Sequence, residues 1–370
     1  MRLRVMLITG SYPPMKCGVG EYTKKLAEAL AALPEVSVSV LTDIRAREYS
    51  HESNVEVMPL IKAWRIREVF QFLSLLRRWK PDIVHIQYPT QGYYENRLLP
   101  WLIPLAAFLL LKKVVQTWHE FYGDPPDLKL LLKAIVPMQL VVVRPQYWEH
   151  LHPKLQKILR KEKITFIRNG STIHQKTLSK PEQADERRKY IKQQKRLIVF
   201  FGFVYPHKGT ELLFDIADPE LDQIVIAGQF GDDAEYHKNI IERASTSTWT
   251  GKITFTGFLS PDDAATLMAV ADAVILPFRT GGGEWNTSIH GAVLQGAFVL
   301  TTSQALNGFD EARNVYYAKI DDVLEMKAAL NRYAGKRRGY DPAIDIDEWQ
   351  QIAAEHYSLY KSIVLPNNHF

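Results

Sequence analysis

Cysteine is almost absent from this chain of 370 residues, which holds only Cys17. A single cysteine excludes an internal disulfide framework and a multi-cysteine zinc cluster, and it fits a reducing compartment. Long apolar runs are also missing. The longest, residues 98–111, is interrupted by Pro100 and Pro104 and falls short of the ~20 residues that a membrane span needs, so we interpret it as a buried helix. The apolar stretch after the basic start is too short for a signal peptide, and we therefore expect a cytoplasmic protein.

A strong charge of either sign is lacking as well. The formal net charge of +5 is mild, and it is compatible with an anionic ligand, a membrane surface or no charged partner. No zinc-finger or RNA-binding signature accompanies it, so we expect no nucleic-acid partner. The length exceeds what one hydrophobic core usually holds and predicts two domains.

Short β-branched runs alternate with helical patterns along the chain, a rhythm typical of parallel α/β sheets. A polar stretch between Ser171 and Arg196 lacks any strand pattern and separates the two halves. We predict an N-terminal Rossmann-like domain over 1–175, a second over 176–345, and a final helix over 346–370 that crosses back toward the first domain. The expected strands are Arg4–Thr9, Ser37–Leu41, Val55–Met58, Ile83–Gln87, Val114–Thr117, Gln139–Val143 and Ile164–Ile167, then Leu197–Phe201, Gln223–Ala227, Ile253–Thr256, Ala273–Leu276 and Phe298–Thr301.

Glycine marks one loop in each half. In the first half an apolar run is followed by Gly10, Gly18 and Gly20, and in the second by Gly202 and Gly209. A strand, a glycine loop and then a helix point backbone N–H groups and the positive end of the helix dipole toward an anion. The pair therefore predicts a phosphate-bearing ligand shared by two domains. The helices expected after these loops run from Glu21 to Leu33 and from Thr210 onward.

Two charged or titratable side chains stand next to these features. His119 follows a strand candidate at its carboxyl end, where ligands of open α/β sheets bind, and it can donate to a sugar hydroxyl or stabilise a developing charge. Lys208 places a mobile positive charge beside Gly209. The alternatives are a histidine that caps a loop and a solvated lysine. His85, inside an apolar strand, is expected to be an interior histidine.

The segment 277–288 is the densest cluster of candidate ligand contacts. Gly281, Gly282 and Gly283 let the backbone approach a ligand closely, Arg279 can bind phosphate bidentately, and Glu284 can accept hydrogen bonds from hydroxyls. The alternative is a purely structural loop. The next residues are favoured at helix N-caps and complete the predicted ligand-binding loop: Asn286, Thr287 and Ser288.

The ordered motifs resemble retaining glycosyltransferases of the GT-B fold, specifically the family 4 type (glycosyl transferases group 1). Any one piece is weak, but their order covers nearly the whole chain. The pieces are Gly10–Pro14 with Gly18–Tyr22, Pro81–Gln87, Thr117–Glu120, Arg168–Gly170, Gly202–Gly209, Ile226–Gly228, Thr256–Leu259, Ala292–Gly296 and the closing segment Trp349–Tyr360.

The resemblance implies two Rossmann-like domains whose parallel sheets face an interdomain cleft. The second domain would bind a nucleotide-diphosphate sugar donor, and the first a saccharide, lipid-linked or small-molecule acceptor, with neither metal nor cofactor. Lys208 would bind the diphosphate and His119 would lie near the sugar. The remaining donor contacts would be Gly18 and Gly20 at the diphosphate, and the loop of Phe258 and Leu259 at the base.

Two positions depart from the family pattern. Phe203 stands where members often carry an arginine, and Arg279 is the obvious substitute. Members also carry two glutamates eight positions apart, and those positions here hold Gly283 and Gly291, with Glu284 one residue from the first. Glu284 is therefore our candidate for the catalytic carboxylate, beside His119 and Lys208.

Three further hypotheses stay open. A nucleotide-sugar 2-epimerase shares the two-domain fold, and a non-catalytic sugar-nucleotide binder would explain the lost arginine and glutamate. A basic, aromatic helical region predicts peripheral contact with anionic lipid, unless its aromatic side is buried and its basic side solvated. That region comprises Trp64, Arg65, Arg67, Phe70, Phe72, Arg77, Arg78, Trp79 and Lys80.

Overall fold

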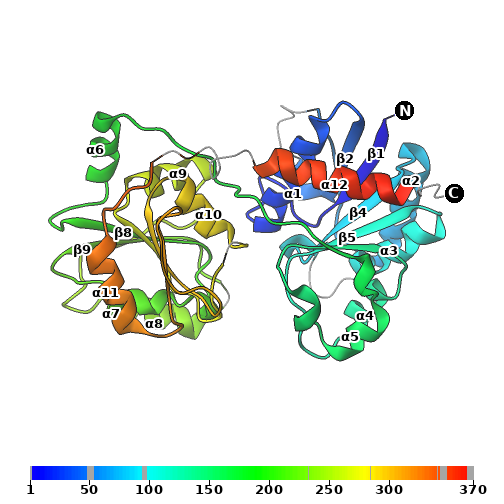
Figure 1. Ribbon diagram of the computed structural model, residues 1–370. Helices are drawn as coiled ribbons and strands as arrows, with labels where there is room; N and C mark the ends of the chain where they lie inside the picture. The colour runs from blue at the N-terminus through cyan, green and yellow to red at the C-terminus, as the bar shows by residue number, and fades with distance from the viewer. Residues whose placement is uncertain are drawn as a thin grey trace. The chain divides into compact units, whose positions relative to one another are not determined.

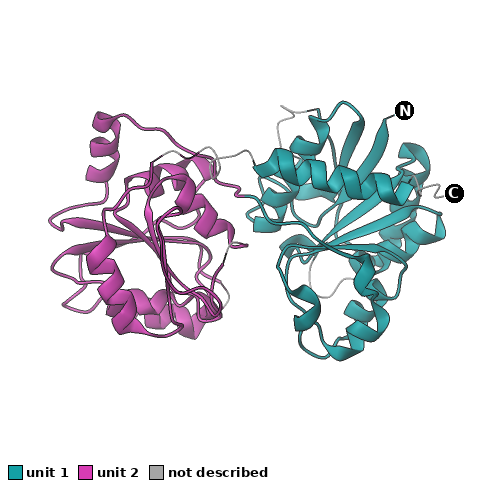
Figure 2. Cartoon of the chain, in the orientation of Figure 1, with its two compact units in different colours: residues 1–170, 347–370 teal, residues 171–346 magenta. Residues whose placement is uncertain are grey.

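The computed structural model describes residues 2–47, 54–93, 98–231, 233–283, 285–339, 341 and 348–364. The chain divides into two compact units (Figures 1 and 2). Unit 1 combines Met1–Gly170 with Asp347–Phe370, and unit 2 is Ser171–Ile346. Each unit is built around its own parallel sheet.

The sheet of unit 1 has the strand order β3-β2-β1-β4-β5-β6-β7, and the pairs within the described residues are parallel. The chain order reverses between β1 and β4, which makes their carboxyl ends the topological switch point, where open α/β sheets bind ligands. The strands are β1 (Leu3–Ile8), β2 (Val36–Asp43), β3 (Glu56–Ile61), β4 (Ile83–Tyr88), β5 (Lys113–Trp118), β6 (Gln139–Val142) and β7 (Ile164–Phe166).

Helices cover both faces of this sheet, so successive strand residues enter two different cores. Val5 and Leu7 pack with residues of α1 and α12, whereas Met6 and Ile8 pack with residues of α2, α3, α4 and α5. Strands buried on both faces read as continuous apolar runs, which explains the strong strand signal in the sequence. The helices are α1 (Gly18–Ala31), α2 (Val69–Trp79), α3 (Leu99–Leu109), α4 (Leu128–Ala134), α5 (Pro153–Ile158) and α12 (Glu348–Val364).

The closing helix α12 lies along α1, so the end of the chain completes the first unit (Figure 1). Its residues Ile352, Ala353 and Tyr360 are buried in the core that α1 shares with the sheet. Their spacing places them on one face, as the sequence pattern predicts.

The sheet of unit 2 has the order β10-β9-β8-β11-β12-β14-β13, with β13 antiparallel to β14. Its switch point lies between β8 and β11. The strands are β8 (Arg196–Phe201), β9 (Asp222–Ala227), β10 (Ile253–Phe255), β11 (Ala273–Leu276), β12 (Phe298–Thr302), β13 (Gly308–Asp310) and β14 (Val315–Ala318), and the helices are α6 (Lys180–Arg188), α7 (Leu213–Ile216), α8 (Ala234–Ala244), α9 (Pro261–Val270), α10 (Thr287–Leu294) and α11 (Val323–Tyr333).

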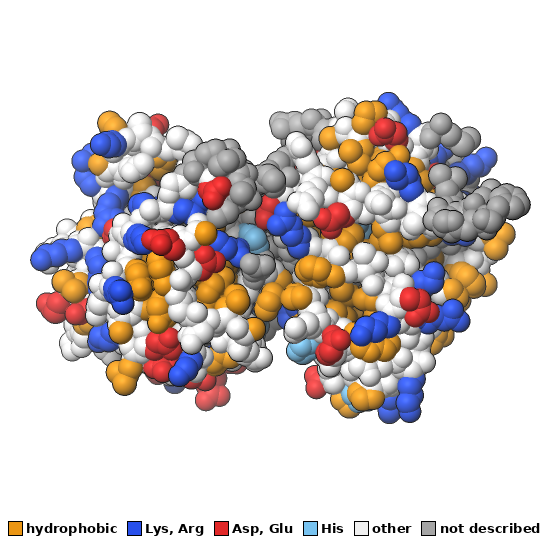
Figure 3. Space-filling model, in the orientation of Figure 1, with side chains coloured by type: hydrophobic (Ala, Val, Ile, Leu, Met, Phe, Trp, Pro, Cys, Tyr) orange, Lys and Arg blue, Asp and Glu red, His pale blue; other side chains and the backbone are white. Residues whose placement is uncertain are grey.

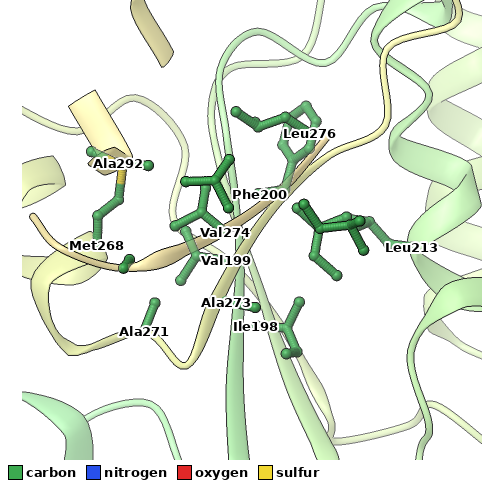
Figure 4. Packing of buried hydrophobic residues seen from close by; sticks show 14 of the residues in the cluster. Ile198, Val199, Phe200, Leu213, Met268, Ala271, Ala273, Val274, Leu276 and Ala292 are labelled. Atoms are coloured by element: carbon green, nitrogen blue, oxygen red, sulfur yellow. The ribbon is translucent and has the colours of Figure 1, made fainter. Parts of the chain in front are cut away.

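The core of unit 2 surrounds β8 and β11. Met268 of α9 and Ala292 of α10 lie on one side of these strands and Leu213 of α7 on the other (Figure 4). All three side chains are fully buried. This packing holds the ends of β8 and β11, and the loops that follow them, in fixed register.

The predicted strands are confirmed, whereas β13 and β14 were not anticipated. The helix expected from Thr210 begins at that residue, but its first turn, Thr210–Leu212, is a 3-10 turn and its α-helical part is the short α7. The helix over 98–111 exists as α3 but is not wholly buried, since Leu109 is 69% exposed. None of the described helices is long and apolar enough to cross a membrane.

Candidate functional site

The loops that follow β1 and β4 pack against each other at the switch point of unit 1. The backbone N–H of Gly92 donates to Ser11 Oγ at 2.8 Å. A Cβ atom added to Gly92 would lie 1.7 Å from the carbonyl oxygen of Gly10. Glycine is therefore required at position 92, because the backbone of the β1 loop passes too close for any side chain. The part of the β1 loop that can bind a ligand is then the start of α1.

The two glycines at the start of α1 differ in what fixes them. A Cβ atom on Gly20 would lie 2.9 Å from the carbonyl oxygen of Ser11, so packing demands this glycine. Gly18 has nothing within 4 Å of such an atom, and the N-cap residue Cys17 makes no side-chain cap. The first-turn amides of α1 thus keep an open approach, which suits an anion.

His119 follows β5 and is held by residues of β4 and α1. Its Nε2 lies 2.9 Å from Gln87 Oε1, and its ring meets that of Tyr22 edge-on at a centroid distance of 4.7 Å. Because an amide oxygen only accepts, Nε2 carries the proton and Nδ1 keeps its lone pair. Nδ1 can therefore accept a hydrogen bond from a sugar hydroxyl.

Burial lowers the pKa of His119 to about 3, and the positive charges of Arg144 and His356 add to the shift. The imidazole is accordingly neutral at physiological pH. Of the two roles expected for His119, hydrogen bonding to the sugar is compatible with a neutral ring, whereas stabilisation by a full positive charge is not.

In unit 2, Gly202 opens the loop after β8. A Cβ atom on Gly228, which follows β9, would lie 1.7 Å from the carbonyl oxygen of Gly202, so the neighbouring loop also crosses at a glycine. A Cβ atom on Gly209 would lie 2.2 Å from the carbonyl oxygen of Pro277, which joins this loop to the one after β11. Residues far apart in the sequence are thus brought to one edge of the sheet.

The N-terminus of α10 faces the same loop. A Cβ atom on Gly202 would lie 3.7 Å from Ser288 Oγ, in the first turn of α10. Asn286 makes no cap on that turn, because its Oδ1 accepts from the N–H of Gly283 at 2.9 Å. The first-turn amides, including those of Thr287 and Ser288, are therefore left without a side-chain cap beside Gly202.

The Gly281–Gly283 segment is tightly fitted. A Cβ atom on Gly282 would lie 2.9 Å from the ring of Phe278, and one on Gly283 would lie 2.3 Å from the ring of Trp285. Gly281 has a φ of 79°, which favours glycine. Glu284, our candidate carboxylate, lies outside the described residues.

Lys208 and Arg279 have different surroundings. The ammonium nitrogen of Lys208 lies 4.6 Å from the centroid of the Phe278 ring. The guanidinium of Arg279 is held by two carboxylates: its Nε donates to Glu211 Oε1 at 2.8 Å and its Nη1 to Asp321 Oδ1 at 2.6 Å. A phosphate would have to compete with Glu211 and Asp321 for Arg279.

The loop after β10 completes this edge. The rings of Phe203 and Phe258 lie 6.5 Å apart, so Phe203 occupies apolar surroundings beside the predicted base-binding loop. Leu259 is half-buried and packs against the core. The structure thus brings the loops of Lys208, Phe258 and Ser288 to one edge of unit 2, whereas Gly18, Gly20 and His119 belong to unit 1.

Some residues of these sites were not predicted from the sequence. Glu211 and Asp321 are far from Arg279 along the chain and carried no signal. Gln87 did carry one, because a polar residue two positions after His85 in an apolar strand must point to the same face. His85 itself is interior, with its ring nitrogens 2.6 Å from Tyr360 Oη and 2.7 Å from Thr117 Oγ1.

Two protein-family models match this chain. A model described as "Glycosyl transferase 4-like domain" matches residues 17–150, and one described as "Glycosyl transferases group 1" matches residues 195–335. The chain belongs to the group 1 glycosyltransferase family. The first matched region contains Gly18, Gly20 and His119, and the second contains Gly202, Lys208 and Arg279. Among the described residues of this glycosyltransferase, no group of three or more His, Cys, Asp or Glu side chains is placed to hold a metal ion.

Solved structures share the fold. A glycosyltransferase from Rickettsia africae ESF-5 is 14% identical with a TM-score of 0.75, covering 99% of this chain and 100% of that one. Anabaena Alr3699/HepE, in complex with UDP-glucose, is 14% identical with a TM-score of 0.69, covering 98% and 96%. The GT-B fold predicted for this glycosyltransferase is confirmed.

One curated relative is closer in sequence over a short region. YtcC of Bacillus subtilis (strain 168), a protein named as a glycosyltransferase, is 30% identical over 133 residues. The match spans 33% of this chain and 31% of YtcC, about a third of that relative's length.

Proposed function

We propose that this chain is a retaining, metal-independent glycosyltransferase that transfers a sugar from a nucleoside-diphosphate donor to a saccharide, lipid-linked or small-molecule acceptor. The observation that carries the proposal is the meeting of the Gly202 loop, Lys208 and the uncapped N-terminus of α10 at the carboxyl edge of β8 and β11. A helix N-terminus next to a glycine loop and a lysine suits a diphosphate. That HepE has been crystallised with UDP-glucose supports the same class of donor.

In the proposed reaction the bond between the anomeric carbon and the diphosphate oxygen breaks, and the acceptor hydroxyl oxygen bonds to that carbon on the same face. Negative charge develops on the leaving diphosphate. Lys208 and the first-turn amides of α10 would stabilise it, as preorganised charges and dipoles do in other active sites. The acceptor's proton would pass to a diphosphate oxygen, so no further base is required. Neutral His119 would bind a sugar hydroxyl through Nδ1.

Calorimetry of the full-length protein with UDP, GDP and ADP tests the donor site, and we expect at least one to bind. The matching nucleotide sugar should then be consumed, with the anomeric configuration retained in the product, and EDTA should leave the rate unchanged. Formation of an epimerised nucleotide sugar without acceptor would instead favour an isomerase. If none of the nucleoside diphosphates binds, the proposed function is wrong.

Peripheral contact with an anionic membrane is the second part of the proposal. The helical region of residues 64–80 divides into two sides: Trp64, Phe72 and Trp79 are buried, whereas Phe70 is 75% exposed and Ile66 51% exposed. Exposed basic residues belong to the same helical region, and Figure 3 shows apolar and basic side chains next to one another on the surface of unit 1. The basic residues are Arg65, Arg67, Arg77, Arg78 and Lys80.

Co-sedimentation with phosphatidylglycerol vesicles checks the membrane contact. The bound fraction should fall steeply with salt, because each basic residue near an anionic surface contributes about 1 kcal/mol and is screened within a Debye length. Phe70→Ala should lower binding several-fold. The matched control is Leu324→Ala, at a side chain of unit 2 that is 81% exposed and is expected to have no effect. Absence of sedimentation at low salt would exclude the contact.

A further inference from the structure

Unit 1 contains a cavity of about 260 Å³. It lies between α3, the segment that runs on from His119, and α4. Its volume is below the range of pockets that enclose drug-sized ligands, so it can hold one small ring rather than a long chain. The lining residues that matter for its chemistry are Trp101, Phe121, Tyr122, Asp124, Asp127 and Lys133.

Lys133 is fully buried at this cavity and is surrounded by aromatic rings. Its Nζ lies 4.3, 4.5 and 4.4 Å from the ring centroids of Tyr88, Trp118 and Tyr122, and 5.1 Å from that of Trp101. No carboxylate of the described residues lies within ion-pair distance of it. Burial lowers the pKa of Lys133 well below its usual value.

The amine of Lys133 has unused hydrogen-bonding capacity. It donates one hydrogen bond, to Tyr122 Oη at 3.0 Å, although a lysine amine has two N–H donors when neutral and three when protonated. The faces of the surrounding rings can attract a positive charge, but apart from Tyr122 Oη they offer the amine no oxygen acceptor. A buried donor group gains most from a ligand that carries oxygen atoms.

The remaining walls combine apolar ring faces with carboxylates. Trp101, Phe121 and Tyr122 offer flat apolar surface, and Asp124 and Asp127 are exposed. The C–H face of a pyranose ring can lie on an aromatic ring while its hydroxyls donate to carboxylates and accept from an amine. We propose that this cavity binds one neutral monosaccharide unit, which, on the proposed glycosyltransferase function, belongs to the acceptor.

The charged side chains at the cavity indicate which class of ligand it can bind. Two exposed carboxylates and one buried amine line the cavity, and the guanidinium of Arg144 lies 4.8 Å from the centroid of the lining Phe121 ring, so charges of both signs are balanced there and no charged ligand is favoured over a neutral one. A quaternary ammonium group would require an aromatic cage of its own, and Lys133 already occupies the rings. A neutral polyol satisfies the donor and both acceptors without a net charge.

Saturation-transfer NMR of the full-length protein with methyl glucoside, methyl mannoside, methyl galactoside and methyl glucuronide tests the proposal. We expect at least one neutral glycoside to bind and the glucuronide not to bind. Asp124→Ala, at an exposed position, should weaken the neutral glycoside about tenfold, the size of one lost hydrogen bond to a charged group. Trp101→Ala should abolish binding, and Glu162→Ala, at an exposed carboxylate away from the cavity, is the matched control.

Three outcomes would overturn the proposal: no neutral glycoside binds, binding persists unchanged in both Asp124→Ala and Trp101→Ala, or the glucuronide binds as well as the neutral sugars. Circular dichroism of Trp101→Ala checks its fold, and Asp124→Ala decides the question if that variant is unfolded. UDP, GDP and ADP binding, measured on the same samples, separates the two claims. Failure of every nucleotide to bind refutes the proposed function, whereas loss of glycoside binding alone refutes only the sugar site.

Discussion

Lys208→Met is expected to lower kcat/KM for the donor by about 100-fold, the lower end of what removing one preorganised charge-stabilising group costs. Methionine keeps an apolar stem over the ring of Phe278, which the Lys208 ammonium approaches to 4.6 Å, and removes only the charge. Because the charge on the diphosphate grows as the sugar leaves, kcat should fall more than donor affinity. Steady-state kinetics of donor hydrolysis or transfer, together with calorimetric UDP binding, measure both quantities.

Two further variants test whether the loss in Lys208→Met is specific to that lysine. Lys238→Ala removes an exposed cation of unit 2 that pairs only with the exposed Glu242 among the ion pairs of the described residues, and it should leave the kinetics unchanged. Arg279→Ala should cost tenfold or less, because its guanidinium is already engaged by Glu211 and Asp321. Equal losses in Lys208→Met and Arg279→Ala would mean that Arg279 leaves its carboxylates to bind the donor. Full activity of Lys208→Met would remove the lysine from the mechanism.

The contrast between these two cations shows what the sequence could and could not predict about the site. Lys208 could be predicted as a site residue because it directly precedes Gly209, and neighbours along the chain are visible in the sequence. The environment of Arg279 depends on Glu211 and Asp321, which are brought to it by the fold from 68 and 42 positions away. Such long-range pairing leaves no periodic or local signal.

The fold was more predictable than the site because its strands are buried on both faces. Val5–Ile8 of β1 and Leu197–Phe201 of β8 are therefore continuous apolar runs. The short edge strand β13, with all its residues half-buried, lacks that signal and was missed. The helix expected from Thr210 does begin there, after Gly209 takes a left-handed conformation with a φ of 66°, but its first turn is a 3-10 turn and its α-helical part is short.

A buried histidine cluster in unit 1 could be predicted only in part from the sequence. His85 was recognised as interior, but its partners on α12 were not, because 275 residues separate it from Tyr360. The ring centroids of His85 and His356 lie 5.6 Å apart. His356 donates from Nδ1 to the carbonyl oxygen of Ile352 at 2.8 Å, and its Nε2 is buried without a hydrogen-bond partner among the described residues.

This cluster should make unit 1 sensitive to acid. Burial lowers the pKa of His356 to about 4, and burial together with nearby positive charge lowers that of His119 to about 3, from the usual 6.5. The pKa of His85 shifts in the same direction. The folded state then binds fewer protons than the unfolded chain, so stability is complete above pH 6.5 and declines as the pH falls toward 4 and 3.

Each pH unit below the unfolded value costs about 1.4 kcal/mol per histidine, so at pH 5 His119 and His356 together should lower the free energy of unfolding by about 4 kcal/mol. Urea denaturation at pH 7.5 and pH 5 measures the loss. Carboxylates also titrate in acid, and His356→Leu isolates the histidine contribution: its loss on acidification should be smaller than the wild type's by about 2 kcal/mol. His150→Gln, at an exposed histidine of the same unit, should behave like the wild type. Equal acid sensitivity in His356→Leu and the wild type would show that His356 gains its proton without opening the packing between α12 and the sheet.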